Sequence, residues 1–312
     1  MRLGIDIGGT NIGLGLVDEE HNIIKKLEIS THRDRGYNFI KSNIIKAINN
    51  LIEYSSDLDK EVQFIGMGIP GIADKASDMI INCPNLAWDS LPLGRELKEI
   101  FGLPIVMEND ANVAAIAESL LGVSKNYSNS VFMTIGTGIG GGIIVDNKLH
   151  SGSHGVGGEI GHIIVGDNFY DCNCGNNGCL ETFASSTAII KFVRHEIKNG
   201  FTDTNLIDNM EDLDTRQIFK SAGLGDRLAI IAMDRMIKYL SIGIVNIINL
   251  IDPEIIVLGG GVAQAGDFLL DKVKSQVKRQ ILFKYMDYAD IKIAKLKNDA
   301  GIIGAAILNA YK

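Results

Sequence analysis

Residues 3–18 read LGIDIGGTNIGLGLVD, and residues 131–146 read VFMTIGTGIGGGIIVD. In the first stretch, apolar residues alternate with small ones around a turn, Gly8-Gly9-Thr10-Asn11, which predicts a strand, a tight glycine turn and a second strand. The second stretch aligns with the first without a gap, 128 positions later, so that Ile7 falls on Ile135. The chain therefore has two halves that open with the same hairpin, although two hairpins can also resemble each other by chance.

Further strands and helices alternate on both sides of the hairpins. The pattern of apolar residues predicts strands over residues 23–29, 64–69, 103–107 and 255–258, and helices over residues 40–52, 111–121 and 300–311. This alternation is typical of an α/β fold.

Three glycine-rich turns follow predicted strands, at Gly8-Gly9, Gly136-Thr137-Gly138 and Gly259-Gly260-Gly261. Backbone amides can approach phosphate oxygens closely only where no side chain intervenes, so such turns suit a nucleotide. Thr10 and Thr137 add hydroxyl donors. The spacing G-x-G-x-x-G occurs at residues 136–141, but a strand follows it where a dinucleotide fold requires a helix, which argues against a nicotinamide or flavin site. One glycine hairpin alone would be an ordinary turn, whereas three together favour phosphate binding.

The composition excludes several classes of protein. The 312 residues are 46% hydrophobic and 22% charged, as in soluble globular proteins, and predict about two domains. The longest apolar run is interrupted by glycine and asparagine, which excludes a membrane span. The net charge of −8, without a basic cluster, argues against nucleic-acid binding. Because the N-terminus lacks the apolar core of a signal peptide, we expect a cytoplasmic protein.

Three of the four cysteines lie close together, with a histidine shortly before them. His162, Cys172, Cys174 and Cys179 have the donor set of a closed tetrahedral zinc site, which is structural because no position remains for a catalytic water. Zinc would then staple the loop over residues 159–181. The alternative is an accidental cluster of reduced cysteines.

Three carboxylates are candidates for chemistry. Asp110 stands between a predicted strand and a helix, where it, like Asn109, could cap the helix or could act as a general base at the carboxyl edge of a sheet. Glu159 and Glu181 flank the metal set. Paired acids beside His162 suit hydrogen bonds to the hydroxyls of a sugar, although either glutamate alone could be an ordinary solvated residue.

These motifs together resemble the ROK family of bacterial sugar kinases and regulators, within the actin-like ATPase superfamily. DIGGTN at residues 6–11 is similar to its first phosphate loop, GTGIGGG at 136–142 to its second, and GGG at 259–261 to its adenosine loop. GEIGH at 158–162 and CNCGNNGCLE at 172–181 are similar to its zinc signature. The resemblance covers residues 3–310.

The resemblance implies a role for each matching residue. Asp110 would be the base that takes the proton from the sugar hydroxyl. Asp6 would organise Mg²⁺ through water. The remaining residues implied to bind the sugar are Gly71, Asn109, Glu159, His162 and Glu181, and those implied to bind ATP are Gly8, Gly9, Thr10, Asn11, Gly136, Thr137, Gly138, Gly259 and Gly260. His162 would have one ring nitrogen on zinc and the other toward the sugar.

The resemblance also implies an architecture and an activity. We expect two actin-like, ribonuclease H-like α/β domains with a cleft between them: residues 1–118, with a C-terminal helix over 300–312 packed back on it, and residues 119–299, which carry zinc. The motifs read most like the glucokinase-like members, which implies an ATP-dependent kinase of carbohydrate metabolism and glycolysis. Alternatives are kinases of mannose, fructose, allose, N-acetylglucosamine or N-acetylmannosamine, and a non-catalytic sugar sensor.

Two further expectations concern partners. Repressors of the family carry a helix-turn-helix domain before the first phosphate loop, and because that loop begins at Asp6 here, we expect a kinase. The resemblance implies a homo-oligomer, a dimer or a tetramer, that binds a small sugar and MgATP.

Overall fold

The computed structural model describes residues 1–74 and 78–311 and divides the chain into two compact units. Unit 1 comprises Met1–Ser128, Gly142–Gly158 and Lys295–Lys312, and unit 2 comprises Asn129–Gly141 and Glu159–Ala294. The domains expected from the sequence have limits at 118 and 299. In the structure, the chain first passes from unit 1 to unit 2 after Ser128, and its last segment in unit 1 begins at Lys295.

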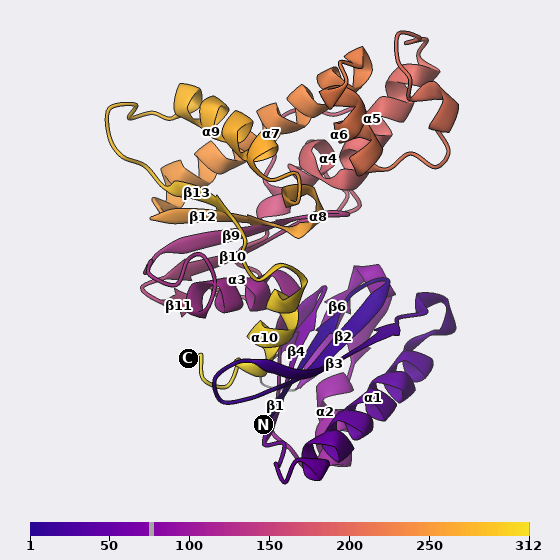
Figure 1. The fold of residues 1–312 in the computed structure, drawn as a ribbon, viewed down its shortest axis with the longest axis vertical. Helices are drawn as coiled ribbons and strands as arrows, with labels where there is room; N and C mark the ends of the chain where they lie inside the picture. Colours follow the sequence, from indigo (N-terminus) through magenta and orange to yellow (C-terminus); the bar gives the residue numbers. More distant parts are fainter. Residues whose placement is uncertain (75–77, 312) are drawn as a thin grey trace. The chain divides into compact units, whose positions relative to one another are not determined.

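The first sheet has five strands in the order β3-β2-β1-β4-β8 (Figure 1). They are β1 (Arg2–Ile7), β2 (Asn11–Val17), β3 (Ile23–Ser30), β4 (Phe64–Ile69) and β8 (Ile105–Asn109). Strand β2 runs antiparallel to both of its neighbours, β1 and β3, whereas β1, β4 and β8 run parallel to one another. Side chains alternate across a strand, so Leu3, Ile5 and Ile7 enter one apolar core together with Ile44 and Ile48 of α1 (Tyr37–Asp57).

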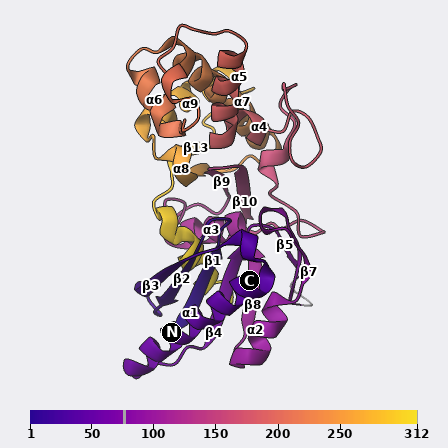
Figure 2. The same cartoon turned by 90° about the vertical axis from the view of Figure 1, so that its right-hand side faces the viewer.

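Smaller elements complete the first part of unit 1. A three-stranded antiparallel sheet is formed by β5 (Ile72–Asp74), β6 (Met79–Cys83) and β7 (Trp88–Leu91), and β5 contacts β8 (Figure 2). The helices α2 (Leu93–Phe101) and α3 (Asp110–Leu120) precede and follow β8.

The second sheet has the order β11-β10-β9-β12-β13. Its strands are β9 (Ser130–Ile135), β10 (Ile139–Val145), β11 (Lys148–Leu149), β12 (Ile255–Gly259) and β13 (Asp290–Ile293). The helices of unit 2 are α4 (Glu181–Ala184), α5 (Ser186–Lys198), α6 (Thr215–Gly223), α7 (Arg227–Ile251), α8 (Gly260–Ala263) and α9 (Asp267–Gln280). None of the helices within residues 1–74 and 78–311 combines the length and the apolar character that a membrane crossing needs.

The repeat expected from the sequence is confirmed to the residue. Strands β1 and β9 begin and end 128 positions apart, and so do β2 and β10. Both sheets also place their strands in the same order, third, second, first, fourth, fifth in the sequence of each half. Two hairpins that resembled each other by chance would not be followed by the same arrangement of the remaining strands, so the α/β fold contains the same sheet twice.

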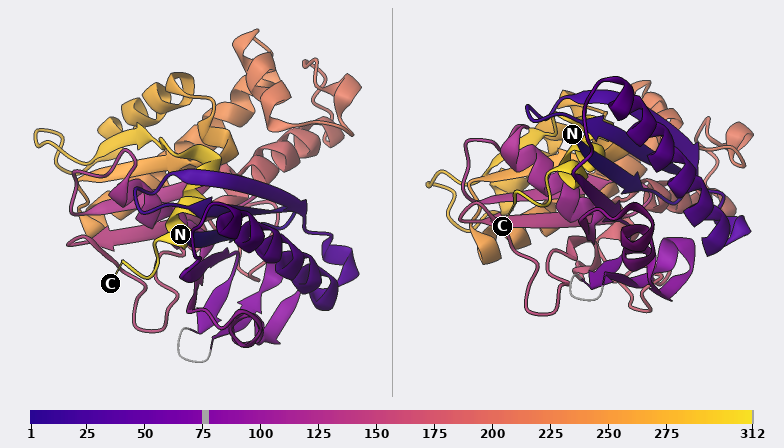
Figure 3. Two further views of the ribbon diagram at one scale, coloured as in Figure 1. Left: turned by 60° about the horizontal axis from the view of Figure 1, so that its bottom comes forward. Right: turned by 90° about the horizontal axis from the view of Figure 1, so that it is seen from below.

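The C-terminal helix α10 (Ala300–Ala306) packs against β1, β4 and α3 of unit 1, and Figures 1 and 3 show it in yellow beside the first strands. Two glycines permit this contact, because a Cβ atom would lie 1.9 Å from the Ile302 carbonyl oxygen at Gly4 and 1.8 Å from the Ala305 carbonyl oxygen at Gly66. The helix is shorter than the expected 300–312. From Ile307 onward the amides bond three residues back, as Ile307 does to Gly304, and residues 307–310 are turns.

Candidate active site

The carboxyl ends of three parallel strands bring predicted acidic residues of unit 1 to one edge of the sheet. Asp6 of β1 pairs with Gly68 of β4, and Gly68 pairs with Glu108 of β8. A Cβ atom on Gly68 would lie 3.5 Å from the Cα atom of Asp110. Ligands of open α/β sheets bind at this edge. Asp6 and Asp110 therefore stand on either side of β4 at the edge where a ligand is expected.

Asn109 is the residue that caps helix α3. Its Oδ1 accepts hydrogen bonds from the amides of Ala111 at 2.9 Å and Asn112 at 3.2 Å, and its Nδ2 donates to the carbonyl of Gly71 at 3.3 Å. The sequence left open whether Asp110 or Asn109 caps this helix. Because Asn109 satisfies the orphan amides, Asp110 is not needed for that purpose.

Asp110 is the first residue of α3, which begins one position before the helix expected from the sequence, and β8 runs to Asn109, two positions beyond the end of the expected strand. Its side chain is half-buried, and its Oδ1 accepts a hydrogen bond from the Ala111 amide at 2.8 Å. Burial raises the pKa of the nearby Cys83 thiol to about 11, and the negative charge of Asp110 adds to this effect. The carboxylate is thus close to the strand β6 that ends at Cys83.

Asp6 is a carboxylate whose pKa is raised by its surroundings. Burial raises its pKa to about 6, and the positive charge of Lys26 partly opposes the shift. The C-terminal helix contributes to the burial, since a Cβ atom on Gly301 would lie 2.3 Å from the Asp6 Oδ2. The sequence analysis expects the C-terminal helix to pack on residues 1–118 but does not single out a contact with Asp6.

The first glycine loop is held by hydrogen bonds from the end of β3. The Gly8 amide donates to the Asn11 carbonyl at 3.0 Å, which closes the turn. Thr31 is fully buried; its amide donates to the Thr10 carbonyl and its hydroxyl to the Gly8 carbonyl, each at 2.8 Å. Both bonds occupy carbonyl oxygens of the loop. Thr31 is a supporting residue that sequence reasoning missed, because a single threonine after a strand carries no distinctive signal.

The second glycine loop, in unit 2, lies against the third. The Gly136 amide donates to the Gly138 carbonyl at 2.9 Å, and Thr137 between them is exposed. Gly260 has a φ of 84°, and a Cβ atom there would lie 2.5 Å from the carbonyl oxygen of Ile135. Only glycine meets both conditions. The predicted ATP-binding residues of unit 2 are therefore brought together.

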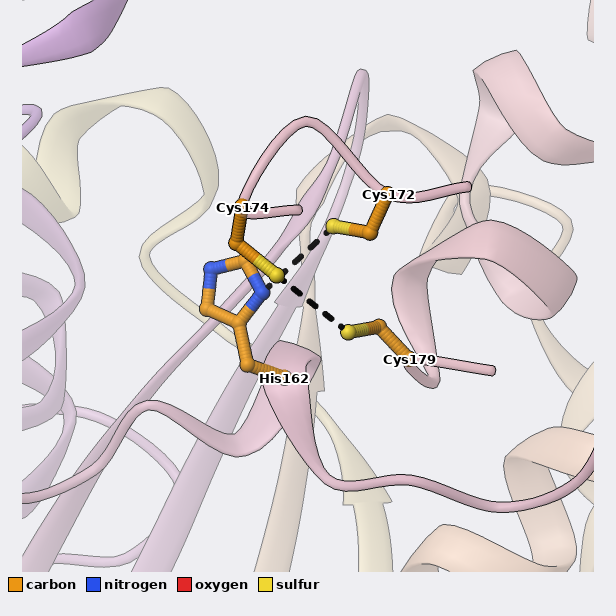
Figure 4. Close-up of side chains that lie close together, drawn as sticks. All are labelled: His162, Cys172, Cys174 and Cys179. Carbon is orange, nitrogen blue, oxygen red and sulfur yellow. Dashed lines mark hydrogen bonds between the residues drawn. The ribbon is translucent and has the colours of Figure 1, made fainter. Parts of the chain in front are cut away.

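The cysteines and the histidine converge as the sequence predicts (Figure 4). The Cys172 sulfur lies 3.7 Å from the His162 Nδ1, the sulfurs of Cys174 and Cys179 lie 3.5 Å apart, and the four ligand atoms all lie within 4.8 Å of one another. Ligands of a tetrahedral zinc ion are roughly 3.5–3.8 Å apart, given zinc–ligand bonds of about 2.0–2.3 Å. The two shorter separations match this value and all four donors are of the type that zinc binds, so the residues fit a zinc ion.

The backbone of the loop forms this arrangement with little regular structure. Gly175 and Gly178 have φ values of 92° and 90°, which favour glycine and allow the chain to turn back between the cysteines. The Asn176 amide lowers the pKa of the Cys174 thiol to about 7, whereas burial raises the pKa of the Cys172 and Cys179 thiols above the ordinary value. Asn177, which the sequence analysis did not single out, ties the loop together by donating to Asp171 Oδ1 at 2.8 Å and accepting from the Asn168 amide at 2.8 Å.

Glu159 and Glu181 lie on two sides of this cluster. The Glu159 Oε2 is 3.9 Å from His162 Nε2, the ring nitrogen that points away from the cysteines. Glu181 begins α4, and its Oε1 accepts a hydrogen bond from the Cys172 thiol at 3.0 Å. The two nitrogens of His162 thus face different partners, one the sulfurs and the other a carboxylate.

The predicted site residues fall into two groups, one in each unit. Unit 1 holds the first glycine loop with Asp6, Gly71, Asn109 and Asp110, and unit 2 holds the second and third glycine loops, the cysteine cluster, Glu159 and Glu181. In unit 1, Asn109 contacts Gly71. In unit 2, the second glycine loop lies against the third, and the cysteine cluster lies beside Glu159 and Glu181. The sequence also matches the ROK family over residues 2–311.

The chain belongs to the ROK family. This ROK chain is 35% identical to a glucokinase of Thermotoga maritima, over 97% of the chain and 95% of that enzyme. It is 30% identical to a xylose repressor of Caldicellulosiruptor bescii, over 97% of the chain but 76% of the repressor. Among solved structures, a ROK family glucokinase from Streptomyces griseus in complex with glucose and AMPPNP has a TM-score of 0.84 and 31% identity, with 98% of each chain covered. The family and the paired actin-like α/β fold expected from the sequence are confirmed.

Proposed function

We propose that this ROK protein is an ATP-dependent hexose kinase, and specifically a glucokinase that transfers the γ-phosphoryl group of ATP to a hydroxyl of glucose. The observation that carries the proposal is the end-to-end likeness to glucokinases, which extends over 95% of the Thermotoga maritima enzyme and 98% of a structure that contains glucose and AMPPNP. The three glycine loops and the acidic residues at the sheet edge would supply the chemistry that such a transfer needs.

Asp110 is the proposed general base. Phosphoryl transfer depends mainly on positioning of the reactants and on charge neutralisation. It also requires a group that accepts the proton of the attacking hydroxyl, and a carboxylate can be that group. Since Asn109 caps the helix, the Asp110 carboxylate can serve this purpose without loss of the helix terminus. Asn109 also fixes Gly71, because its Nδ2 bonds the Gly71 carbonyl. Asn109 and the Gly71 backbone are proposed to hold sugar hydroxyls.

The glycine loops are the proposed ATP site. Gly8, Gly9, Thr10 and Asn11 in unit 1, and Gly136, Thr137, Gly138, Gly259 and Gly260 in unit 2, would present backbone amides and hydroxyls to the nucleotide. The bonds from Thr31 occupy the Gly8 and Thr10 carbonyls of the first loop. Asp6, at the end of β1, would organise Mg²⁺ through water.

The cysteine cluster is the proposed structural zinc site. His162, Cys172, Cys174 and Cys179 would hold the ion, and when bound the ion supplies a cross-link between His162 and the cysteine loop. That cross-link would keep Glu159, His162 and Glu181 in place toward the sugar. His162 Nε2, which faces Glu159 and not the sulfurs, remains available to a hydroxyl.

The family also contains regulators, and a sugar sensor without kinase activity is the second candidate. It is favoured by the 30% identity to a xylose repressor over 97% of this chain. The chain covers 95% of the Thermotoga maritima glucokinase but 76% of that repressor. The match to the glucokinase therefore extends over more of the matched protein's length, which favours the kinase. We further propose a cytoplasmic homodimer or homotetramer that acts in glycolysis on a small sugar and does not bind nucleic acid, in keeping with a net charge of −8.

The deciding experiment is to measure ADP release from MgATP with a panel of sugars and a control without sugar. The panel contains glucose, mannose, fructose, allose, xylose and both N-acetylhexosamines, and bound zinc is measured on the same preparation. Glucose-preferring turnover supports the glucokinase, and preference for another member changes the substrate but keeps the kinase. Absence of turnover with every sugar, in zinc-loaded protein that binds one of them, supports the sensor and overturns the kinase.

A further inference from the structure

Gly138 of the second glycine loop lies directly against the carboxylate of Glu181. A Cβ atom added to Gly138 would lie 2.7 Å from the Glu181 Oε2 and 3.9 Å from its Cδ. Real Cβ atoms essentially never approach an oxygen this closely. Gly136, two residues earlier in the same loop, has no such neighbour within 4 Å of a Cβ atom. The absence of a side chain at Gly138 is therefore what leaves room for this carboxylate.

The carboxylate of Glu181 borders the cysteine loop on its other side. Its Oε1 lies 3.0 Å from the Cys172 sulfur, so the two oxygens face two different neighbours, Cys172 and Gly138. Glu181 is half-buried. Because the cysteine loop lies on one side of this carboxylate and the glycine loop on the other, the carboxylate can adopt few positions. The glycine loop therefore helps to determine its position.

The backbone on both sides of the cysteine loop also packs on this glycine turn. A Cβ atom on Gly161, next to His162, would lie 2.0 Å from the Ile139 carbonyl oxygen. The Ser186 amide, at the start of α5, donates to the Gly136 carbonyl at 2.8 Å. The turn at residues 136–139 thus contacts the segment before the cysteine loop at Gly161 and the segment after it at Glu181 and Ser186.

We propose that Gly138 is a positioning residue for the sugar: it belongs to the nucleotide loop, yet it determines where the Glu181 carboxylate stands. This inference rests on the proposed function, in which Glu181 holds a sugar hydroxyl. A methyl group at position 138 displaces Glu181, and the displacement is cheap because the atom that must move is the end of a flexible side chain. The substitution therefore weakens sugar binding before any nucleotide is present, while the fold persists.

The test compares Gly138→Ala with Gly136→Ala, two substitutions that add the same methyl group to the same loop. Glucose binding to the full-length, zinc-loaded proteins is measured by calorimetry without nucleotide, together with zinc content. We expect Gly138→Ala to raise the glucose Kd on the order of tenfold with zinc retained. We expect Gly136→Ala, which meets no neighbour, to leave the glucose Kd within about twofold of wild type.

A second variant separates displacement of Glu181 from general damage to the loop. Glu181→Asp shortens the side chain by one methylene, so in the double variant with Gly138→Ala the contact is relieved. We expect the double variant to bind glucose more tightly than the product of the two single effects predicts. Equal glucose Kd values for wild type and Gly138→Ala, or strictly additive effects in the double variant, would overturn the inference while leaving the kinase intact. Wild-type protein that neither binds nor phosphorylates any sugar of the panel would overturn the proposed function and this inference with it.

Discussion

The Glu118 carboxylate accepts a hydrogen bond from the backbone amide of Leu296, 2.7 Å from Oε1, although the two residues are 178 positions apart. Its other oxygen, Oε2, accepts from the Val123 amide at 2.8 Å, and the side chain is fully buried at the end of α3. Val123 lies shortly before the chain leaves unit 1 at Ser128, and Leu296 directly after it returns at Lys295. One buried carboxylate therefore anchors both of these segments to unit 1.

We expect Glu118→Ala to lower the free energy of unfolding by about 3–5 kcal/mol, because two backbone amides lose their acceptor at a buried position. Urea denaturation measures the change. Glu254→Ala is the matched control: Glu254 also accepts a backbone amide, that of Asn129 at 2.8 Å, but at an exposed position. The control should cost about 0.5 kcal/mol or less. Equal losses for the two variants would contradict a special role for burial.

We expect Asp110→Asn to lower kcat by a factor of about 10²–10⁴, because the amide cannot accept the proton of the sugar hydroxyl. The fold should persist, since Asn retains an Oδ1 that can accept the Ala111 amide and the cap is supplied by Asn109. Steady-state kinetics and calorimetry of sugar and nucleotide binding test this together. Turnover close to wild type would rule out Asp110 as the base, whereas lost binding would point to a role in the ground state.

We expect Cys174→Ser to reduce bound zinc well below roughly one ion per chain and to weaken sugar binding in the same preparation. The matched control is Cys83→Ser, because Cys83 is the fourth cysteine of the chain and lies outside the cluster. That variant should keep its zinc even if its stability falls. Elemental analysis gives the zinc content and calorimetry the sugar affinity. A Cys174→Ser protein with full zinc and unchanged sugar affinity would refute the metal cross-link.

We expect a distinct pH dependence of stability from Asp6, whose pKa is raised by burial to about 6 from the ordinary 3.8. Because the folded-state pKa is the higher one, ionisation disfavours the folded state, and this penalty develops as the pH rises from 3.8 to about 6. Relative to Asp6→Asn, the free energy of unfolding of wild type should therefore fall by about 1 kcal/mol between pH 5 and pH 7.5. Denaturation of ligand-free protein at both pH values tests it. Parallel pH profiles of the two proteins would mean that Asp6 titrates normally.

The sequence predicts the two hairpins and the cysteine cluster well because their signals are local. Alternating apolar residues around a glycine turn define β1 and β2 within a few positions, and the same letters recur at β9 and β10. The metal ligands from Cys172 to Cys179 are close in sequence, so their spacing alone predicts their convergence.

The contacts that the sequence could not reveal connect distant residues. Neither the Glu118–Leu296 bond nor the contact of Gly301 with Asp6 produces a periodic pattern in the sequence. The burial that raises the pKa of Asp6 is therefore not visible in the sequence either. The end of the last helix was also misjudged. Ile307 and Leu308 are as buried as the helix before them, so an apolar pattern continues where the backbone changes to tighter turns.

The matching hairpins have the form of a duplicated segment, in which neither copy has gained or lost a residue from Arg2 to Val17 or from Ser130 to Val145. Asp6 corresponds to Thr134, and each pairs with a glycine of the neighbouring strand, Gly68 or Gly259. The backbone around this position is thus built the same way in both halves, while its side chain is an acid in one and a hydroxyl in the other. One backbone plan used twice therefore offers two equivalent positions at which different side chains can give each half its own task.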